Sequence, residues 1–275
     1  MENRLASKDP NESQLRVPAG CRPTTRDRDQ REITESIEEY TEGIYRLQQE
    51  LSVVGTGDVS RYMTVSPASA TAMLKKLAEL RLVEHTPYHG VRLTADGTRL
   101  SLSLLRRHRL VECLLVNFLE LPWDDVHELA CKLEHYLSEE VADRIERALG
   151  YPTTCPHGNP VDASVEDLTR PLADCVAGEV VIISRITDER TEFLGYLLEI
   201  GLVPQTEARI ESKSPFGDVI TLRLPGLDSL IAVGREVSSS IRVVSPIRYS
   251  NPLSVVAGSV NNQSVEFVTT PAVTA

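Results

Sequence analysis

The stretch HELACKLEH, residues 127–135, brings four potential metal ligands into nine positions: His127, Cys131, Glu134 and His135. In a helix, these spacings of three and four residues place all four side chains on one broad face. Imidazole, thiolate and carboxylate groups are common protein ligands of transition-metal ions. The same residues also fit a plain amphipathic helix, in which Leu129 and Leu133 pack against a core and the cysteine is a small buried side chain. The stretch alone leaves both interpretations open.

The composition is that of a globular protein with reduced cysteines. The chain has 275 residues, of which 41% are hydrophobic, enough for one large domain or several small ones. It has no apolar run of about eighteen residues. Its first residues, MENRLASKDPNESQ, lack the apolar core of a signal peptide, so we expect a cytoplasmic location. Five cysteines without paired spacing argue against a disulfide framework and leave a thiolate available at Cys131.

Charge is unevenly distributed along the chain. The net charge is −11, which by itself would disfavour nucleic-acid binding. Residues 56–99 nevertheless hold six Lys and Arg against four Asp and Glu. A locally basic module of this kind can bind DNA, with a strong dependence on salt.

The first periodic apolar pattern begins at Thr34, a plausible N-cap, and predicts a helix that continues to about Leu51. Its start carries Glu38, Glu39 and Glu42. Acids at a helix N-terminus more often compensate the helix dipole than bind a metal ion, so both roles remain open here. Residues 1–32 lack such a pattern and are expected to form a mobile extension.

The following segment has the layout of a winged helix-turn-helix. A short helix near residues 58–63 is followed by a turn, and Ser66 with Pro67 then predicts the capped start of a second helix. The stretch LVEHTPYHGVRLT predicts a β-hairpin. In a winged helix-turn-helix the second helix enters the major groove of DNA, although a helical hairpin can also serve only for packing.

Residues 98–119 predict a long helix that is apolar over much of its circumference, which suggests burial against a second subunit as well. His108 and Glu112 lie four residues apart on it. Asp124 is a candidate cap for the helix that carries HELACKLEH, and SEEVADRIERAL predicts one more helix. Antiparallel packing of the two longer helices would bring His108 and Glu112 near His127.

Residues 152–171 are rich in Pro, Gly and polar residues and mark a domain boundary. The runs beyond it, GEVVIISRI, EARIES, VITLRL and SIRVV, predict strands, with one helix at TEFLGYLLEIGL. This pattern predicts a small β-barrel of about eighty residues. The final stretch, from residue 247 on, contains β-prone residues without a clear pattern.

In the order of these parts and in several motifs, residues 34–246 resemble the diphtheria-toxin-repressor family of metal-dependent transcriptional repressors, of the iron-dependent repressor or manganese transport regulator type. The segments that carry the resemblance are EEYTEGIYRL (38–47), VSPASATAMLKKL (65–77), RRHRLVEC (106–113), HELACKLEH (127–135) and PHGNP (156–160). The barrel is similar to the small SH3-like domain of ferrous-iron transport systems.

The resemblance implies an α+β chain of six parts. They are a mobile N-terminal extension (1–32), a winged helix-turn-helix DNA-binding domain (33–100), a helical dimerisation and metal-binding domain (101–151), a linker (152–170), an SH3-like barrel (171–246) and a C-terminal tail (247–275). It further implies a homodimer that binds palindromic operators on double-stranded DNA when loaded with metal, without a membrane partner.

Two metal sites follow from the resemblance. The first, which would control DNA binding, comprises Cys131, Glu134, His135 and the residue at position 39, which is Met in the iron-type branch and Glu39 here. The manganese-type branch has a carboxylate there and another at the position of Glu42, but usually Glu at the position of Cys131. The second site would use His108, Glu112 and His127, with Glu189 and Glu192 from the barrel. In the manganese-type branch the residue matching His108 instead joins a paired-metal cluster with the acids of the first helix.

Ligand chemistry narrows the ion only in part. Carboxylates suit Mn²⁺ or Fe²⁺, whereas thiolate and imidazole favour later ions, and affinity alone would select Zn²⁺ or Cu²⁺. We expect Mn²⁺ or Fe²⁺, with Glu39 and Glu42 favouring Mn²⁺. The expected DNA-binding residues are Ser66, Ser69 and Thr71 on the recognition helix, Lys75, Lys76 and Arg92 at phosphates, and Tyr88 and His89 at the wing tip. Ala72, where iron-type members carry Gln, leaves the operator sequence open.

Three other functions fit parts of the sequence. A winged-helix regulator that no longer senses metal would bind its operator equally well in the presence of a chelator. A hydrolytic metalloenzyme could use the same ligands with one open coordination position, but the chain has no nucleophile motif and no Gly-rich phosphate loop. An iron-transport accessory protein built around the barrel would leave the capped helix and the hairpin unexplained. We therefore expect a regulator and not an enzyme.

Overall fold

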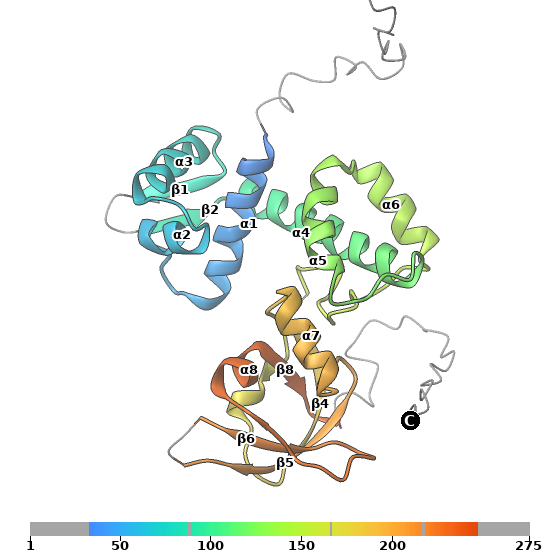
Figure 1. Cartoon of the computed structure of the whole chain (residues 1–275). Coiled ribbons are helices and arrows are strands. Elements are labelled where there is room, and N and C mark those ends of the chain that lie inside the picture. The colour runs from blue at the N-terminus through green and yellow to red at the C-terminus, as the bar shows by residue number, and fades with distance from the viewer. Residues whose placement is uncertain (1–32, 87–89, 166, 216–217, 247–275) are drawn as a thin grey trace, which may run out of the picture.

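The computed structural model describes residues 33–86, 90–165, 167–215 and 218–246. They form an N-terminal helical unit with a β-hairpin, a second helical unit and a C-terminal β-sheet unit (Figure 1). The expected N-terminal extension, the C-terminal tail and the wing-tip residues Tyr88 and His89 lie outside these ranges. Within them, no helix is both long enough and apolar enough to cross a membrane.

The N-terminal unit has the predicted winged helix-turn-helix order. Its elements are α1 (Glu35–Glu50), α2 (Thr56–Tyr62), α3 (Pro67–Glu79), β1 (Val83–Thr86) and β2 (Gly90–Leu93). The two strands pair antiparallel, with Val83 opposite Leu93. Ser66 caps α3 as expected, since its Oγ accepts a hydrogen bond from the backbone N–H of Ser69 at 3.1 Å. Thr34 occupies the N-cap position of α1 but makes no side-chain capping hydrogen bond.

The second unit consists of α4 (Ala95–Asn117), α5 (Val126–Leu133), the 3-10 helix η3 (Glu134–Tyr136) and α6 (Glu139–Ala148). The α-helical part of HELACKLEH ends at Leu133, so Glu134 and His135 lie in a 3-10 turn and do not continue the α-helical face. The expected cap was also wrong. Asp125, not Asp124, is the N-cap residue of α5, and it makes no side-chain capping hydrogen bond.

The core side of α5 differs from the one expected. Val126 and Ala130 are fully buried against Val111 and Leu115 of α4. Leu129 and Leu133 remain 39% and 45% exposed, so they do not anchor the helix. The reason is that the short helix fills its contact with α4 through the Val126–Ala130 stripe, which leaves the other apolar side chains on the surface. Further exposed apolar side chains of this unit are Phe118, Leu119 and Tyr136.

The C-terminal unit has the predicted SH3-like character. Its elements are β3 (Arg170–Pro171), η4 (Leu172–Asp174), β4 (Val180–Ile186), α7 (Thr191–Glu199), β5 (Glu207–Lys213), β6 (Ile220–Arg223), β7 (Ile231–Val233), α8 (Arg235–Ser240) and β8 (Ile241–Val244). The strands pair antiparallel in the order β3-β8-β4-β5-β6-β7. Within the described part of the chain β3 and β7 do not pair, so hydrogen bonds do not close the sheet into a ring.

Residues 155–160 hold the second and third units together. Trp123, in the loop before α5, packs against the core of the sheet unit. The Trp123 carbonyl lies 2.7 Å from Nε2 of His157, and Asn159 Nδ2 donates to the carbonyl of Ile186 at 3.1 Å. Gly158 has φ +84°, and a Cβ there would lie 2.1 Å from the Ser184 carbonyl oxygen. Only glycine permits this approach, which fixes His157 and Asn159 between the two units.

Two helical glycines allow a matched test of how closely α4 packs against the backbone before β1. A Cβ at Gly97 would lie 2.0 Å from the backbone oxygen of Leu82, which precedes β1, whereas at Gly57 the nearest atom is the flexible Arg61 Nη1 at 3.9 Å. We expect Gly97→Ala to lower the free energy of unfolding by about 2–3 kcal/mol through overpacking. Gly57→Ala should change it by about 0.5 kcal/mol or less, towards greater stability. Urea unfolding of both variants measures this, and equal effects would contradict the close packing at Gly97.

Candidate metal centre

His108 lies at the centre of a buried cluster of ionisable side chains. Its Nδ1 is 2.6 Å from Glu134 Oε2, and its Nε2 is 3.0 Å from Glu112 Oε1. Nδ1 of His127 lies 3.2 Å from His108 Nε2. The packing of α4 against α5 therefore brings His108 and Glu112 to His127, as the sequence predicted. Cys131, one turn after His127 on α5, places its Sγ 3.6 Å from His127 Nε2.

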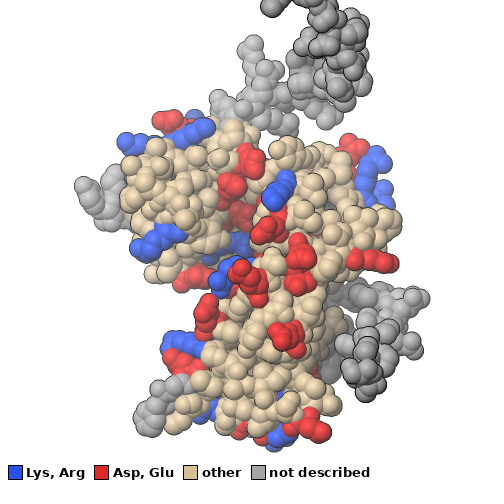
Figure 2. Space-filling view, in the orientation of Figure 1, with Lys and Arg blue, Asp and Glu red and all other residues tan. Residues whose placement is uncertain are grey.

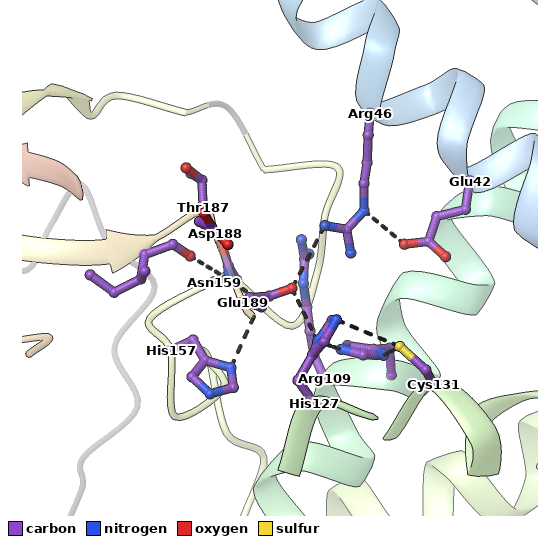
Figure 3. Close-up of polar contacts among 12 residues, drawn as sticks. Glu42, Arg46, Arg109, His127, Cys131, His157, Asn159, Thr187, Asp188 and Glu189 are labelled. Atoms are coloured by element: carbon purple, nitrogen blue, oxygen red, sulfur yellow. Dashed lines mark hydrogen bonds and ion pairs between the residues drawn. The ribbon is translucent and has the colours of Figure 1, made fainter. Parts of the chain in front are cut away.

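The linker and the sheet unit complete the cluster from the other side. Glu189, in the loop between β4 and α7, places Oε2 3.4 Å from His127 Nδ1. His157 Nδ1 lies 3.0 Å from Glu112 Oε1 and 3.8 Å from Glu189 Oε1. Figure 3 shows His127 and Cys131 on one side of Glu189 and His157 on the other.

Two groups of four potential ligands result and share two carboxylates. One comprises His108, Glu112, His127 and Glu189, and the other comprises Glu112, Cys155, His157 and Glu189. In each group, one ligand atom of every residue lies within 4.8 Å of the others. A third group, of His108, His127 and Cys131, overlaps the first. The four cysteines that the structure describes are all free thiols.

Helix α1 reaches the cluster through its acids. Glu38 places Oε2 2.7 Å from His135 Nδ1, and its Oε1 accepts a hydrogen bond from Arg107 Nη2 at 2.7 Å. Glu39 forms a more exposed ligand group with Glu35 and His135. Thus the ligands predicted for the first site are divided: Cys131 lies beside His108 and His127, Glu134 lies beside His108, and His135 lies beside the acids of α1.

Two predicted ligands are placed away from these groups. Glu42 is bound by Arg46, whose Nε donates to its Oε1 at 2.8 Å. Glu192, on α7, is exposed. Neither belongs to a ligand group among the residues that the structure describes.

Three members of these groups were not expected as ligands: Cys155, His157 and Glu35. Glu38 was expected only as one of three acids near the start of the first helix, with a metal role left open. A signal for the first two was present, since His157 stands in the segment PHGNP, directly after Cys155, in the linker. It gave no reason to expect that the linker would fold back onto α4. Glu35 and Glu38 were not distinguishable from other acids at the start of a helix.

The polar atoms of the cluster fit a cation. Glu112 Oε2 and Glu189 Oε2 are buried and have no hydrogen-bond partner. His157 Nδ1 is buried as well, and its 3.0 Å contact with Glu112 Oε1 is not aligned as a hydrogen bond. A buried polar atom left without a partner costs about 1–3 kcal/mol. All three belong to the same four-residue group, whose thiol, imidazole and carboxylate donors are those that divalent transition ions accept. The donor set of this group therefore fits a divalent ion.

Protonation of the cluster is governed by its carboxylates. Burial opposes charge on His108, but Glu112, Cys131 and Glu134 together outweigh it and hold the pKa of His108 well above its usual range. Burial also opposes charge on His127, yet contacts with Cys131 and Glu112 raise its pKa to about 10. Against the effect of burial, both imidazoles lower the pKa of the Cys131 thiol. Metal ligation requires neutral imidazoles, so an ion that binds here displaces protons.

The predicted DNA-contacting residues lie on α3 and β2. Ser66, Ser69, Lys75, Lys76 and Arg92 are exposed, and Thr71 is partly exposed. The Thr71 hydroxyl donates to the Pro67 carbonyl at 2.7 Å. In Figure 2 the acidic side chains form a band down the middle of the visible face, while Lys and Arg side chains lie towards the outer edge of the N-terminal unit. The acidic side chains are therefore not spread evenly over this face.

Fold and cluster together are those of a winged-helix regulator with a candidate metal centre at the junction of its units, and the comparisons support this class of protein. Residues 32–91 match the family "Iron dependent repressor, N-terminal DNA binding domain", residues 94–162 match "Iron dependent repressor, metal binding and dimerisation domain", and residues 170–245 match "FeoA domain". The iron-dependent repressor IdeR of Mycobacterium tuberculosis is 28% identical over 229 residues, which cover 77% of this chain and 98% of that protein.

Solved structures give the same result. A manganese-dependent transcriptional repressor in complex with manganese has a TM-score of 0.70 and 32% identity over 76% of this chain and 99% of its own. ScaR with bound Zn²⁺ has a TM-score of 0.68 and 29% identity over 76% of this chain and 99% of its own. The chain belongs to the diphtheria-toxin-repressor family, and it is a metal-dependent DNA-binding transcriptional repressor. The proteins of this family are repressors and not enzymes.

The stabilising contribution of His127 should fall as pH rises. Its pKa is about 10 in the folded chain and about 6.5 in an unfolded one. The imidazolium therefore stabilises the fold fully below pH ~6.5 and progressively less towards pH ~10. We expect the difference in free energy of unfolding between wild type and His127→Asn, measured by urea unfolding with chelator present, to shrink across this window. A difference that grows with pH would contradict the charge arrangement.

Proposed function

We propose that this repressor controls genes of manganese or iron homeostasis from the cytoplasm, with Mn²⁺ or Fe²⁺ as co-repressor. The printed names of its relatives support this choice, since they include an iron-dependent repressor and a manganese-dependent one solved with manganese. The carboxylates Glu112 and Glu189 are hard donors that suit both ions, while the Cys131 thiol suits later ones. Glu39 on α1 favours Mn²⁺ over Fe²⁺.

The observation that carries the proposal is the convergence of buried ligands from separate units of the chain. Glu112 comes from α4, His157 from the linker and Glu189 from the sheet unit, and each has a buried atom without a hydrogen bond. Buried polar atoms are normally hydrogen-bonded, so three exceptions among neighbouring residues need an explanation. A bound cation supplies the missing partner and joins the second unit, the linker and the sheet unit.

We assign two neighbouring ion positions at this junction. One position, which matches most of the second site expected from the sequence, would be held by His108, Glu112, His127 and Glu189. Cys131 and Glu134 lie beside it. The other position would be held by Cys155 and His157 together with the same two carboxylates, Glu112 and Glu189. His135 with Glu39 and Glu35 forms the edge nearest the DNA-binding unit. Glu42 and Glu192 remain predictions from the family resemblance.

The placement of these ligands connects metal to DNA. Glu39 lies on α1 in the DNA-binding unit and His135 lies in η3 of the second unit, so their joint use favours the arrangement in which the two units are close. That arrangement orients α3 relative to the second unit. Coupling of this kind is reciprocal. Operator DNA should therefore raise the affinity for metal by the same factor by which metal raises the affinity for DNA.

A dimer would present two copies of α3 to DNA. The family model over residues 94–162 is described as a dimerisation domain, and this region exposes apolar side chains in Phe118, Leu119, Leu129, Leu133 and Tyr136. Apolar surface of this kind is a typical subunit contact. A two-fold dimer recognises two inverted half-sites, which supports a palindromic operator.

One observation favours a second candidate, a regulator that does not need metal. Glu38 already bridges α1 to the second unit through Arg107 and His135, at 2.7 Å from each. If this buried bridge alone held the units together, operator binding would not change on addition of a chelator. The comparison of operator affinity with and without Mn²⁺ or Fe²⁺ separates the two functions.

Metal binding is best tested at two glutamates of the sheet unit. Trp123 is the only tryptophan of the chain, and its ring centroid lies 5.2 Å from that of His157, so its fluorescence reports on the cluster. Under anaerobic, reducing conditions we expect Mn²⁺ or Fe²⁺ to quench it saturably. Glu189→Gln should weaken binding by roughly 10–100-fold, the range seen when a metal site loses supporting groups. The control is Glu199→Gln, at an exposed position of the following helix α7 that belongs to no ligand group among the residues that the structure describes, and an equal loss there would refute the assignment.

DNA binding is best tested by salt dependence. Lys75 and Lys76 are exposed on α3, and each phosphate contact they make should contribute roughly one unit to the slope of log affinity against log salt. With DNA from the region upstream of the chain's own gene and with Mn²⁺ present, we expect Lys75→Ala and Lys76→Ala to weaken binding and reduce this slope. Lys213→Ala, in the sheet unit, is the control. Slopes equal to that of wild type would show that α3 does not face DNA.

A further inference from the structure

Arg46 is a cation placed between carboxylates from two different domains. On α1, its Nε donates to Glu42 Oε1 at 2.8 Å, one helical turn away. Its Nη1 lies 3.6 Å from Glu189 Oε2, in the loop that leads from β4 to α7. Figure 3 shows the side chain extending from α1 towards Glu189. The guanidinium thus forms a direct ionic contact between the DNA-binding unit and the sheet unit.

The oxygen that faces Arg46 is one of the unsatisfied atoms of the metal cluster. Glu189 Oε1 accepts a hydrogen bond from Asn159 Nδ2 at 2.7 Å. Oε2 is buried without a hydrogen bond and has two positive or ionisable neighbours, Arg46 at 3.6 Å and His127 at 3.4 Å. The Glu189 side chain is only 6% exposed, so water does little to screen these charges.

Arg46 also accounts for the position of Glu42. A carboxylate at this position of α1 was predicted to bind metal, but here it is paired with Arg46 and lies outside every ligand group that the described residues form. Arg109 adds a second guanidinium nearby, but its Nη1 donates to the Pro160 carbonyl and not to a carboxylate. Of these two arginines, Arg46 is therefore the one that contacts a carboxylate of the ligand cluster, that of Glu189.

We propose that Arg46 is a resident cation that competes with the divalent ion for Glu189 and so raises the ion concentration at which the repressor becomes loaded. The inference rests on the proposed metal-sensing function. A carboxylate that binds a divalent ion neutralises a neighbouring guanidinium less well than one that binds the guanidinium alone. Two cations against the same carboxylate also repel each other. Loading must therefore weaken the contact between Arg46 and Glu189. By linkage, the intact contact must weaken loading.

Through this competition, the contact of α1 with the sheet unit depends on whether the ion is bound. This holds even if no residue of α1 binds the ion. While Arg46 is paired with Glu189, α1 is held to the sheet unit. When Glu189 turns to the ion, Arg46 retains Glu42, so its charge stays neutralised on α1 and the helix is released from the sheet unit. The DNA-binding unit then keeps its contacts with the second unit through Glu38 and with the linker, where the Tyr45 hydroxyl donates to the Ala163 carbonyl at 3.2 Å.

The test is Mn²⁺ titration of full-length variants by Trp123 fluorescence, with calorimetry as a second measurement. We expect Arg46→Gln to bind Mn²⁺ roughly tenfold more tightly than wild type, because the competing charge is gone. Arg46→Lys should remain within about threefold of wild type, because a point charge is kept. The control is Arg144→Gln, which breaks another i, i+4 pair, to Glu140 at 2.9 Å on α6. Unchanged or weaker Mn²⁺ binding by Arg46→Gln would overturn the inference.

Glu42 provides a second arm. If it acts only by holding Arg46, Glu42→Gln should weaken Mn²⁺ binding in wild type by leaving Arg46 to Glu189, and should have no effect in an Arg46→Gln background. Weakening in both backgrounds would make Glu42 a ligand and would remove the need for competition at this position.

A third arm separates this inference from the metal-sensing function. With chelator present, urea unfolding of Arg46→Gln, Glu189→Gln and the double variant forms a double-mutant cycle. We expect the double variant to lose less stability than the two single variants together, because each removes the same contact. Strictly additive losses would contradict the contact. If instead wild type showed no saturable response to Mn²⁺ or Fe²⁺, the proposed function would fail while the cycle could still show the ionic contact.

Discussion

The burial of Glu112 is the constraint on which the arrangement of the three units depends. Its side chain is completely buried within α4. A carboxylate in such a place is stable only if cations or donors from elsewhere approach it. His108, His127 and His157 do so, from α4, α5 and the linker, and they hold the pKa of Glu112 well below its usual range, against the effect of burial. Helix α5 and residues 155–160 must therefore pack where these imidazoles meet the carboxylate.

Around that centre, two residues of α1 make ionic contacts with the rest of the chain. Glu38 connects α1 with Arg107 and His135, and Arg46 connects α1 with Glu189. One contact leads to the second unit and the other to the sheet unit. Because both involve residues of the ligand cluster or their direct partners, a change in charge at the cluster alters the balance between them. This is how a small ion can influence the orientation of α3 at a distance, as a shift between existing arrangements.

Local patterns in the sequence predicted the elements well where the determinants are themselves local. Ser66 and Pro67 start α3, and β1 pairs with β2 where the stretch LVEHTPYHGVRLT predicts a hairpin. The errors concern α5, where the end of the helix, its cap and its buried side depend on α4. Periodicity could not choose between the Leu129–Leu133 stripe and the Val126–Ala130 stripe, because both have the spacing of a helix face and only the shape of the α4 surface decides between them.

The sequence by itself determined the class of protein: the order of a winged helix, a helical unit and a small sheet unit, and the residue types available for a metal centre. The tertiary structure alone decided which of these residues meet. It brought Cys155 and His157 of the linker to Glu112, divided the expected ligands of HELACKLEH between two neighbourhoods, and paired Glu42 with Arg46. The physical reason is that spacing along the chain defines faces within one helix, whereas a ligand cluster between units depends on long-range packing and on the need to neutralise buried charge.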